Sequence, residues 1–261
     1  MSATTNIFGF DFRCGGSYES IANEVIRDVS ENTMGPTNFI TPNAHGINEY
    51  LKFSELDRFC KTSRYVLPDG QPIVWLSKLT ENPIQQRLTG SDFFPVMFNK
   101  IRGSEYKCLF LVSNASVRDL LMKEKPDAVY IIPEFFQMKE AEKIDRIGEE
   151  MCQKIVQHKL NYIFIGISEP KQGALAKSAT EKLLKQNYKE ACVFFFLGAS
   201  YEFYFGLKKR APVIVQKLGL EWFYRLITEP KRMYKRYIFG NFIFVVRAIR
   251  WIFDRKAYSN P

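Results

Sequence analysis

Short, uncharged apolar runs alternate with longer amphipathic stretches along most of this 261-residue chain, and this alternation restricts its fold more than any other feature. The runs are CLFLVS at 108–113, AVYII at 128–132, NYIFIGI at 161–167 and ACVFFFLG at 191–198. They have the length and composition of buried strands. Strands buried on both faces need a helical layer on each side. The pattern predicts an α/β, Rossmann-like fold with a mostly parallel sheet and helices on both faces.

The N-terminal part follows the same alternation. Residues 5–14 and 37–42 are predicted to be strands, and YESIANEVIRDVSE between them has apolar residues at helical spacing. We therefore expect the chain to open with a β-α-β unit. Further helices are predicted at SVRDLLMKE, at 139–158 and at 173–186.

The positive charge of the chain is concentrated near its C-terminus. Residues 207–256 contain thirteen Lys and Arg against three acidic residues, an excess of ten, whereas the whole chain has a net charge of +9. The same segment changes to helical patterns rich in cations and aromatics, with breaks at Pro212 and Pro230. We expect two parts, an α/β core over residues 1–206 and a basic helical C-terminal appendage over residues 207–261.

The most apolar segment of the appendage is YIFGNFIFVVRAIRWIF at 237–253. Its 17 residues are fewer than the roughly 20 that a spanning helix needs, and Arg247 and Arg250 would be costly inside a bilayer. Aromatic residues beside cations are typical of helices that lie in the plane of an anionic membrane surface. The pattern favours such an interfacial helix, and the alternative is a C-terminal helix that packs on the core.

Several classes of function lack their sequence signatures. Five scattered cysteines give no disulfide framework, and only two histidines are present, so we expect a reducing compartment, no bound metal and no cofactor. The first residues show no secretory signal, which favours the cytoplasm. The sequence has no G-x-G-x-x-G, no P-loop, no G-x-S-x-G and no Asp-x-Asp motif.

Polar residues follow three of the predicted strands. Thr41 and Asn43 follow the first, Asp69 lies in a Pro-Asp-Gly turn that leads into an apolar helix, and Gln172 follows NYIFIGI. Ligands of open α/β sheets bind at the carboxyl ends of strands, and a carboxylate there is suited to accept a proton from an attacking hydroxyl. The alternatives are that Asp69 is an N-cap or turn residue and that the others satisfy loop backbone.

At this point the chain resembles the WecG/TagA/CpsF glycosyltransferases over residues 7–237. FGLKKRAPVIVQKLGLEWFYRLITEPKRMYKRY at 205–237 is similar to that family's G-x-x-x-R-A-P, G-L-E-W-x-Y-R-L, E-P-x-R and R-Y patterns. Upstream, TPN, PDG, RLTGSD and EPKQ are similar to the family's T-x-N, D-G, R-x-x-G-x-D and P-K-Q, in the same order.

The resemblance implies transfer of a sugar from a UDP-sugar to a polyprenyl-diphosphate-linked saccharide, with inversion and without a metal, at the inner face of the cell membrane. It implies that Asp69 is the catalytic base, that Thr41 and Asn43 line the sugar pocket, and that Arg87 and Gln172 bind substrate. The family's cations that close over the site and stabilise the departing diphosphate match Arg225, Arg232 and either Lys235 or Arg236. An N-acetylmannosamine-type sugar or another hexose is the implied donor sugar, and relatives point to self-association as a homo-oligomer.

Two departures from the family pattern bear on activity. SNAS replaces a Gly-rich turn after the strand at 108–113, and Gly173 stands where the family has a carboxylate. The alternative to an enzyme is therefore a catalytically silent, membrane-docked scaffold of a polysaccharide-assembly complex. A nucleic-acid partner is not expected, because the cations of the appendage alternate with bulky apolar residues and no recognised nucleic-acid motif is present.

Overall fold

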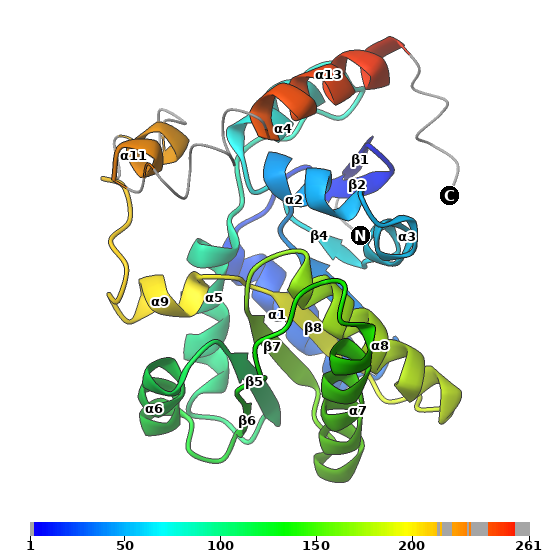
Figure 1. The fold of residues 1–261 in the computed structure, drawn as a ribbon, viewed down its shortest axis with the longest axis vertical. Coiled ribbons are helices and arrows are strands. Elements are labelled where there is room, and N and C mark those ends of the chain that lie inside the picture. The colour runs from blue at the N-terminus through cyan, green and yellow to red at the C-terminus, as the bar shows by residue number, and fades with distance from the viewer. Residues whose placement is uncertain (1–2, 213–214, 216–220, 229, 231–239, 254–261) are drawn as a thin grey trace.

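A six-stranded sheet forms the centre of the protein (Figure 1). The computed structural model describes residues 3–212, 215, 221–228, 230 and 240–253. The strand order is β4-β3-β8-β7-β5-β6, and every neighbouring pair in it is parallel. The predicted parallel α/β fold is therefore confirmed. The strands are β3 (Thr37–Ile40), β4 (Tyr65–Val66), β5 (Cys108–Val112), β6 (Val129–Ile131), β7 (Tyr162–Gly166) and β8 (Val193–Phe196).

The central strands bury side chains on both faces of the sheet. Ile163 and Ile165 of β7 lie in one hydrophobic cluster, and Phe164 between them lies in the other. Neighbouring strands follow the same two-residue period, and Phe164 stacks on Phe110 and Phe195 at centroid distances of 5.0 and 4.6 Å. The continuous apolar runs in the sequence are the consequence of this double burial.

Helices cover each face, as the alternation predicts. One cluster is completed by α1 (Tyr18–Ser30), α5 (Gly90–Ile101) and α6 (Ala115–Glu124). The other contains residues of α2 (Ala44–Tyr50), α3 (Ser54–Lys61), α4 (Gln71–Ser77), α7 (Ala141–His158) and α8 (Lys171–Lys185). The described helices also include α9 (Ser200–Tyr204), α11 (Glu221–Thr228) and α13 (Gly240–Phe253). All five cysteines are buried free thiols, in agreement with the expected absence of a disulfide framework.

The predicted β-α-β opening is wrong at its first strand. Residues 5–14 form most of a separate antiparallel hairpin, β1 (Thr4–Ile7) and β2 (Phe10–Arg13), and the parallel sheet begins at β3. Phe8 and Gly9 form the two-residue turn, with φ of 56° and 83°. Positive φ at both central residues is the requirement of a type I′ turn. Phe is rare in that conformation, and the local sequence therefore contains no signal for a turn at this point.

The apolar segment near the C-terminus forms α13, which packs against α2 and the hairpin (Figure 1). Phe244 and Trp251 are buried, and their rings lie 5.5 and 5.9 Å from that of Phe8. The Asn48 amide donates to the carbonyl of Gly240 at 2.7 Å and accepts from Arg247 at 2.8 Å. One side of the helix thus packs on the core.

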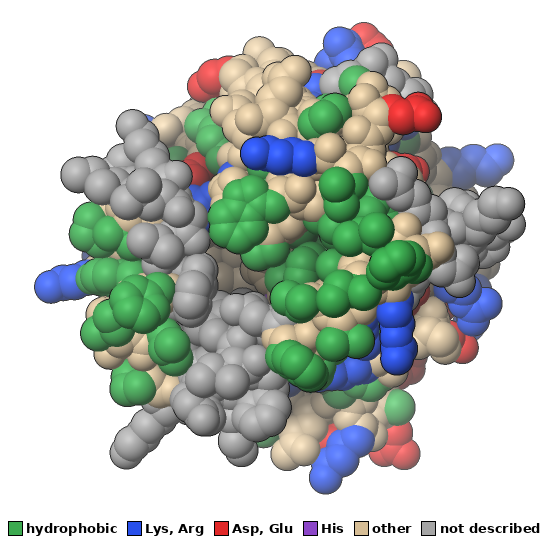
Figure 2. Space-filling model, turned by 90° about the horizontal axis from the view of Figure 1, so that it is seen from above, with side chains coloured by type: hydrophobic (Ala, Val, Ile, Leu, Met, Phe, Trp, Pro, Cys, Tyr) green, Lys and Arg blue, Asp and Glu red, His purple; other side chains and the backbone are tan. Residues whose placement is uncertain are grey.

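The other side of α13 is exposed and apolar. In Figure 1, α13 and α4 lie together at the top of the molecule, and Figure 2, which looks down on that end, shows apolar side chains gathered there with cations nearby. We call this surface the apolar face. It consists of Phe242, Ile243, Val245, Ile249, Ile252 and Phe253 of α13. Among the residues that the structure describes, no helix combines the length and the hydropathy needed to cross a bilayer.

Candidate active site

A cavity of about 540 Å³ lies at the carboxyl ends of the strands. Its walls include residues that follow all six strands of the sheet, among them Thr41, Asp69, Ser113, Phe135 and Gln172. This is the edge at which open α/β sheets bind ligands. Four predicted site residues, Thr41, Asn43, Asp69 and Gln172, therefore lie in the walls of one cavity.

Asp69 lies in the turn between β4 and α4. Its backbone N–H donates to the carbonyl of Pro42 at 3.3 Å, which brings the Pro-Asp-Gly turn against the Thr-Pro-Asn segment. Gly70, with φ of 150°, is the N-cap residue of α4, and no side chain caps that helix. The N-cap interpretation of Asp69 is thus wrong, and Asp69 lies in the segment between β4 and α4 that lines the cavity.

Asn43 has a structural role as well as a place in the cavity. Its Oδ1 accepts from the backbone N–H groups of His45 and Gly46, at 3.1 and 3.0 Å, and so caps α2. The alternative that Asn43 satisfies backbone groups of the loop is therefore correct for its Oδ1 atom. Its NH₂ group is the part suited to bind a ligand. Thr41 is buried against Gly90, where a Cβ would lie 2.8 Å from Thr41 Oγ1. The Gly of the RLTGSD segment therefore allows α5 to start directly beside Thr41.

Gln172 is held from both ends of its side-chain amide. It is only 2% exposed; its Nε2 donates to Glu169 Oε1 at 3.1 Å, and its Oε1 accepts from the backbone N–H of Gly198 at 3.2 Å. Glu169 Oε1 also accepts from the hydroxyl of Tyr50 at 2.8 Å. Burial, together with the nearby Glu169 charge, raises the pKa of Tyr50 well above its usual range, so this hydroxyl remains a donor. Sequence reasoning did not select Glu169 as a site residue.

Arg87 is not among the residues that line the cavity. It lies close enough to Asp92 to influence that carboxyl electrostatically. Asp92 accepts from Thr89 at 2.7 Å and from Arg210 at 2.5 Å. Burial would raise the pKa of Asp92, but the hydrogen bonds from Arg210 and Thr89 outweigh burial, and the net pKa is lowered. The RLTGSD segment is thus joined by an ion pair to the R-A-P motif that opens the appendage.

The described walls of the cavity are rich in carboxylates. Four acidic side chains, Asp69, Glu134, Glu169 and Glu202, face two lysines. Of these lysines, Lys208 pairs with Glu202 at 2.5 Å, and Lys171 lies over the rings of Phe135 and Phe136 at 4.5 and 4.9 Å. Glu134 pairs with Arg146, which is not a lining residue, and the lining side chains themselves include more acidic than basic groups.

The predicted diphosphate-binding cations are only partly within the described structure. Arg225 belongs to α11, and its side chain is not described. Arg232, Lys235 and Arg236 lie outside the described residues. Their roles therefore remain predictions.

The two departures from the family pattern have local structural explanations. Ser113 lines the cavity, and Asn114 of the SNAS turn caps α6 by accepting from the N–H of Val117 at 3.0 Å. At Gly173, a Cβ would lie 3.0 Å from Leu56 Cδ1, so a larger side chain would require the Leu56 side chain of α3 to shift.

Comparison with known proteins agrees with the motif pattern. Residues 5–258 match the Glycosyl transferase WecG/TagA/CpsF family. The N-acetylglucosaminyldiphosphoundecaprenol N-acetyl-β-D-mannosaminyltransferase of Bacillus subtilis is 30% identical over 177 residues, which cover 66% of this chain and 63% of that protein. The enzyme of the same name from Staphylococcus aureus is 25% identical over 237 residues, 89% of this chain and 87% of its own length. With a match that spans both the cavity-lining segments and the C-terminal motifs, this chain belongs to the WecG/TagA/CpsF family of glycosyl transferases.

Proposed function

We propose that this protein transfers a sugar from a UDP-sugar to a polyprenyl-diphosphate-linked saccharide in the synthesis of a cell-surface polysaccharide. The observation that carries the proposal is the convergence of Thr41, Asn43, Asp69 and Gln172 on one cavity at the carboxyl edge of the sheet. The names of the relatives support a lipid-linked acceptor, because those enzymes act on N-acetylglucosaminyldiphosphoundecaprenol.

In the proposed mechanism Asp69 acts as general base. It takes the proton from the acceptor hydroxyl while that oxygen attacks the anomeric carbon and the bond to the UDP oxygen breaks. A single displacement of this kind inverts the anomeric configuration. Thr41, Asn43 and Gln172 hold the sugar, and Arg87 contributes to substrate binding.

The departing diphosphate gains negative charge that the carboxylate-rich cavity walls cannot neutralise. In the proposal, Arg225 and Arg232, with Lys235 or Arg236, close over the cavity and supply the missing positive charge without a metal. Guanidinium groups are suited to this role because they bind phosphate oxygens in a bidentate manner. The appendage, residues 207–261, thus completes the site of the core, residues 1–206.

Membrane contact through the apolar face is part of the proposal. Large aromatic and aliphatic side chains are exposed there, Arg250 is exposed among them, and the sequence of α13 contains no acidic residue. Such a surface is suited to anionic headgroups and the outer acyl region of a bilayer. Binding at the inner face of the cell membrane would bring the cavity close to a lipid-linked acceptor.

The test is a transfer assay with purified protein, N-acetylglucosaminyldiphosphoundecaprenol and a panel of UDP-sugars, with EDTA present. The proposal predicts UDP release and a lipid product extended by one sugar, with UDP-N-acetylmannosamine the expected donor and UDP-hexoses the second choice. Absence of product with every donor, with anionic vesicles present or absent, would instead favour a silent scaffold.

A salt-sensitive affinity for DNA or RNA would contradict the expectation that nucleic acid is not a partner.

A further inference from the structure

A carboxylate that the sequence patterns leave unassigned, Glu169, holds the Gln172 amide and the hydroxyl of Tyr50. Glu169 precedes the P-K-Q segment, and its Oε1 accepts from both Gln172 Nε2 and the Tyr50 hydroxyl. Tyr50 ends α2, the helix that Asn43 caps at its start. Glu169 therefore links α2, the helix that Asn43 caps, to the first turn of α8, which carries Gln172.

The contacts of Gln172 restrict an amide that lines the cavity. If the amide of Gln172 were flipped, its oxygen would face the Glu169 carboxylate and its NH₂ group would face the N–H of Gly198, so both hydrogen bonds would be lost. The observed orientation is consequently fixed from both ends. Gln172 Nε2 has a second N–H, which in this orientation is suited to donate to a sugar oxygen.

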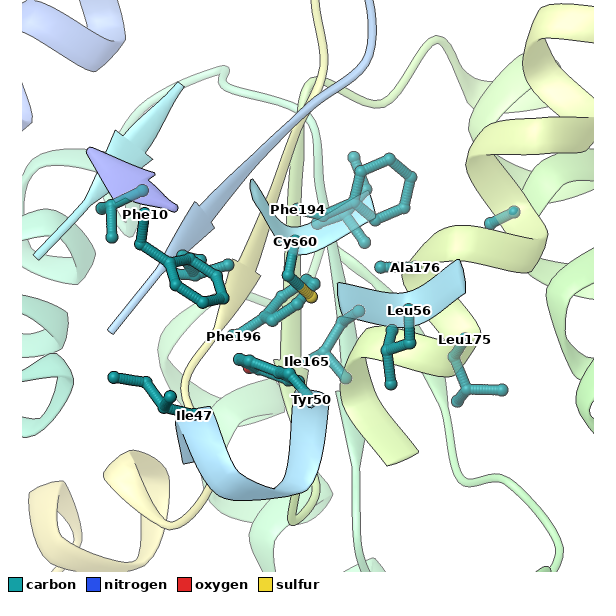
Figure 3. Close-up of a cluster of buried hydrophobic side chains, with 14 of the residues drawn as sticks. Phe10, Ile47, Tyr50, Leu56, Cys60, Ile165, Leu175, Ala176, Phe194 and Phe196 are labelled. Carbon is teal, nitrogen blue, oxygen red and sulfur yellow. The ribbon is translucent and has the colours of Figure 1, made fainter. Parts of the chain in front are cut away.

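The link is anchored in the hydrophobic core. Figure 3 shows Tyr50 among Phe10, Ile165 and Phe196, and its side chain is fully buried. On the other side of the carboxylate, a Cβ at Gly46 would lie 2.1 Å from Glu169 Oε2. The carboxylate thus has little room to move between its hydrogen bonds and α2.

We propose that Glu169 is a positioning residue for donor-sugar recognition: by accepting from Gln172 and Tyr50 it fixes the Gln172 amide and its spacing from Asn43, so that the pair binds the hydroxyl or amide oxygens of the transferred sugar. Glu169 acts through Gln172. This inference rests on the proposed function, because it assumes that the cavity binds a sugar nucleotide.

In the proposal, Glu169 contributes to binding of the sugar part of the donor and not to binding of the nucleotide part. Both hydrogen bonds end on one oxygen, so Glu169→Gln can keep them through its amide oxygen, whereas Glu169→Ala removes the acceptor. We expect Glu169→Ala to raise KM for the UDP-sugar about tenfold or more, which is the scale of losing a hydrogen bond to a charged group, with a smaller change in kcat. Glu169→Gln should restore KM to within about threefold of wild type.

The experiment combines these kinetics with calorimetric binding of UDP as a sugar-free probe. UDP affinity should change less than about twofold in Glu169→Ala, and Tyr50→Phe should raise the KM of the UDP-sugar by a smaller factor than Glu169→Ala. Glu150→Ala, an exposed change on α7, none of whose residues is among those that line the cavity, serves as the control.

The inference and the proposed function fail in different ways. A wild-type protein that neither binds UDP nor turns over any UDP-sugar contradicts the proposed function. If wild type is active, equal loss of UDP and UDP-sugar affinity in Glu169→Ala overturns the positioning role, and so does an unchanged KM. A KM for the UDP-sugar that rises as much in Glu169→Gln as in Glu169→Ala would also overturn it. The negative charge of Glu169, and not its hydrogen-bond acceptor, would then be what binding requires.

Discussion

Trp251 and Phe253, two residues apart on α13, should have opposite roles. Trp251 is 3% exposed and packs near Phe8, whereas Phe253 is 87% exposed on the apolar face. Truncation of a buried Trp costs about 3–5 kcal/mol of unfolding free energy, since transfer free energy and packing are both lost. Truncation of an exposed side chain changes it by about 0.5 kcal/mol or less. Trp251→Ala should therefore weaken the docking of α13, and Phe253→Ala should leave it intact.

Membrane affinity should respond to Phe253 directly. Full burial of a Phe side chain contributes about 1.5–3 kcal/mol, so its loss from a bilayer-contacting surface lowers the partition coefficient by roughly tenfold to a hundredfold. Hydrogen exchange of α13 and urea unfolding measure how firmly α13 is docked on the core. Sedimentation with anionic vesicles measures the membrane affinity. A Phe253→Ala protein that unfolds more easily yet binds vesicles as wild type does would refute the assignment of the two faces.

Three further outcomes follow from the site and the apolar face. Gly46→Ala places a Cβ against the Glu169 carboxylate and should therefore raise the KM of the UDP-sugar. The melting temperature should not fall, since Ala favours helix more than Gly does. The lowered pKa of Asp92 means that its pairing with Arg210 contributes stability above the ordinary Asp value of 3.8 and loses it as pH falls through the folded-state pKa. Asp92→Asn should therefore lower the melting temperature at pH 7, and the difference from wild type should narrow below pH 3.8; an equal difference at both pH values would contradict this. Vesicle binding should weaken with added NaCl and with zwitterionic lipid, and salt-independent binding would exclude the electrostatic part of membrane contact.

The parallel sheet was predictable because strands buried on both faces leave a plain signal. Runs such as NYIFIGI contain no polar side chain in their centre, and β7 buries all of its residues. The turn at Phe8 and Gly9 was not predictable, because Phe rarely adopts positive φ and the ring of Phe8 packs against Phe244 and Trp251, more than 230 residues away in the sequence. Local propensity does not contain that contact.

In the candidate site, too, some residues could be predicted from the sequence and others could not. Asp69 and Gln172 could be selected because each follows a strand, and strand ends meet at one edge of a parallel sheet. Glu169 could not, because its significance comes from Tyr50, which is 119 residues distant. The ion pair of Arg210 with Asp92 likewise joins motifs 118 residues apart that the sequence presents as unrelated. Contacts between polar groups that lie far apart in the sequence cannot be predicted from the local pattern of residues.

The role of Asp69 as general base is tested by the rate of UDP release by Asp69→Asn with the lipid-linked acceptor, compared with wild type under the same metal-free conditions. Loss of a general base lowers kcat by roughly 10²- to 10⁴-fold, while the isosteric amide should leave UDP binding and thermal melting unchanged. That combination is the predicted result. An Asp69→Asn protein that releases UDP at the wild-type rate would show that another group accepts the proton and would contradict the account.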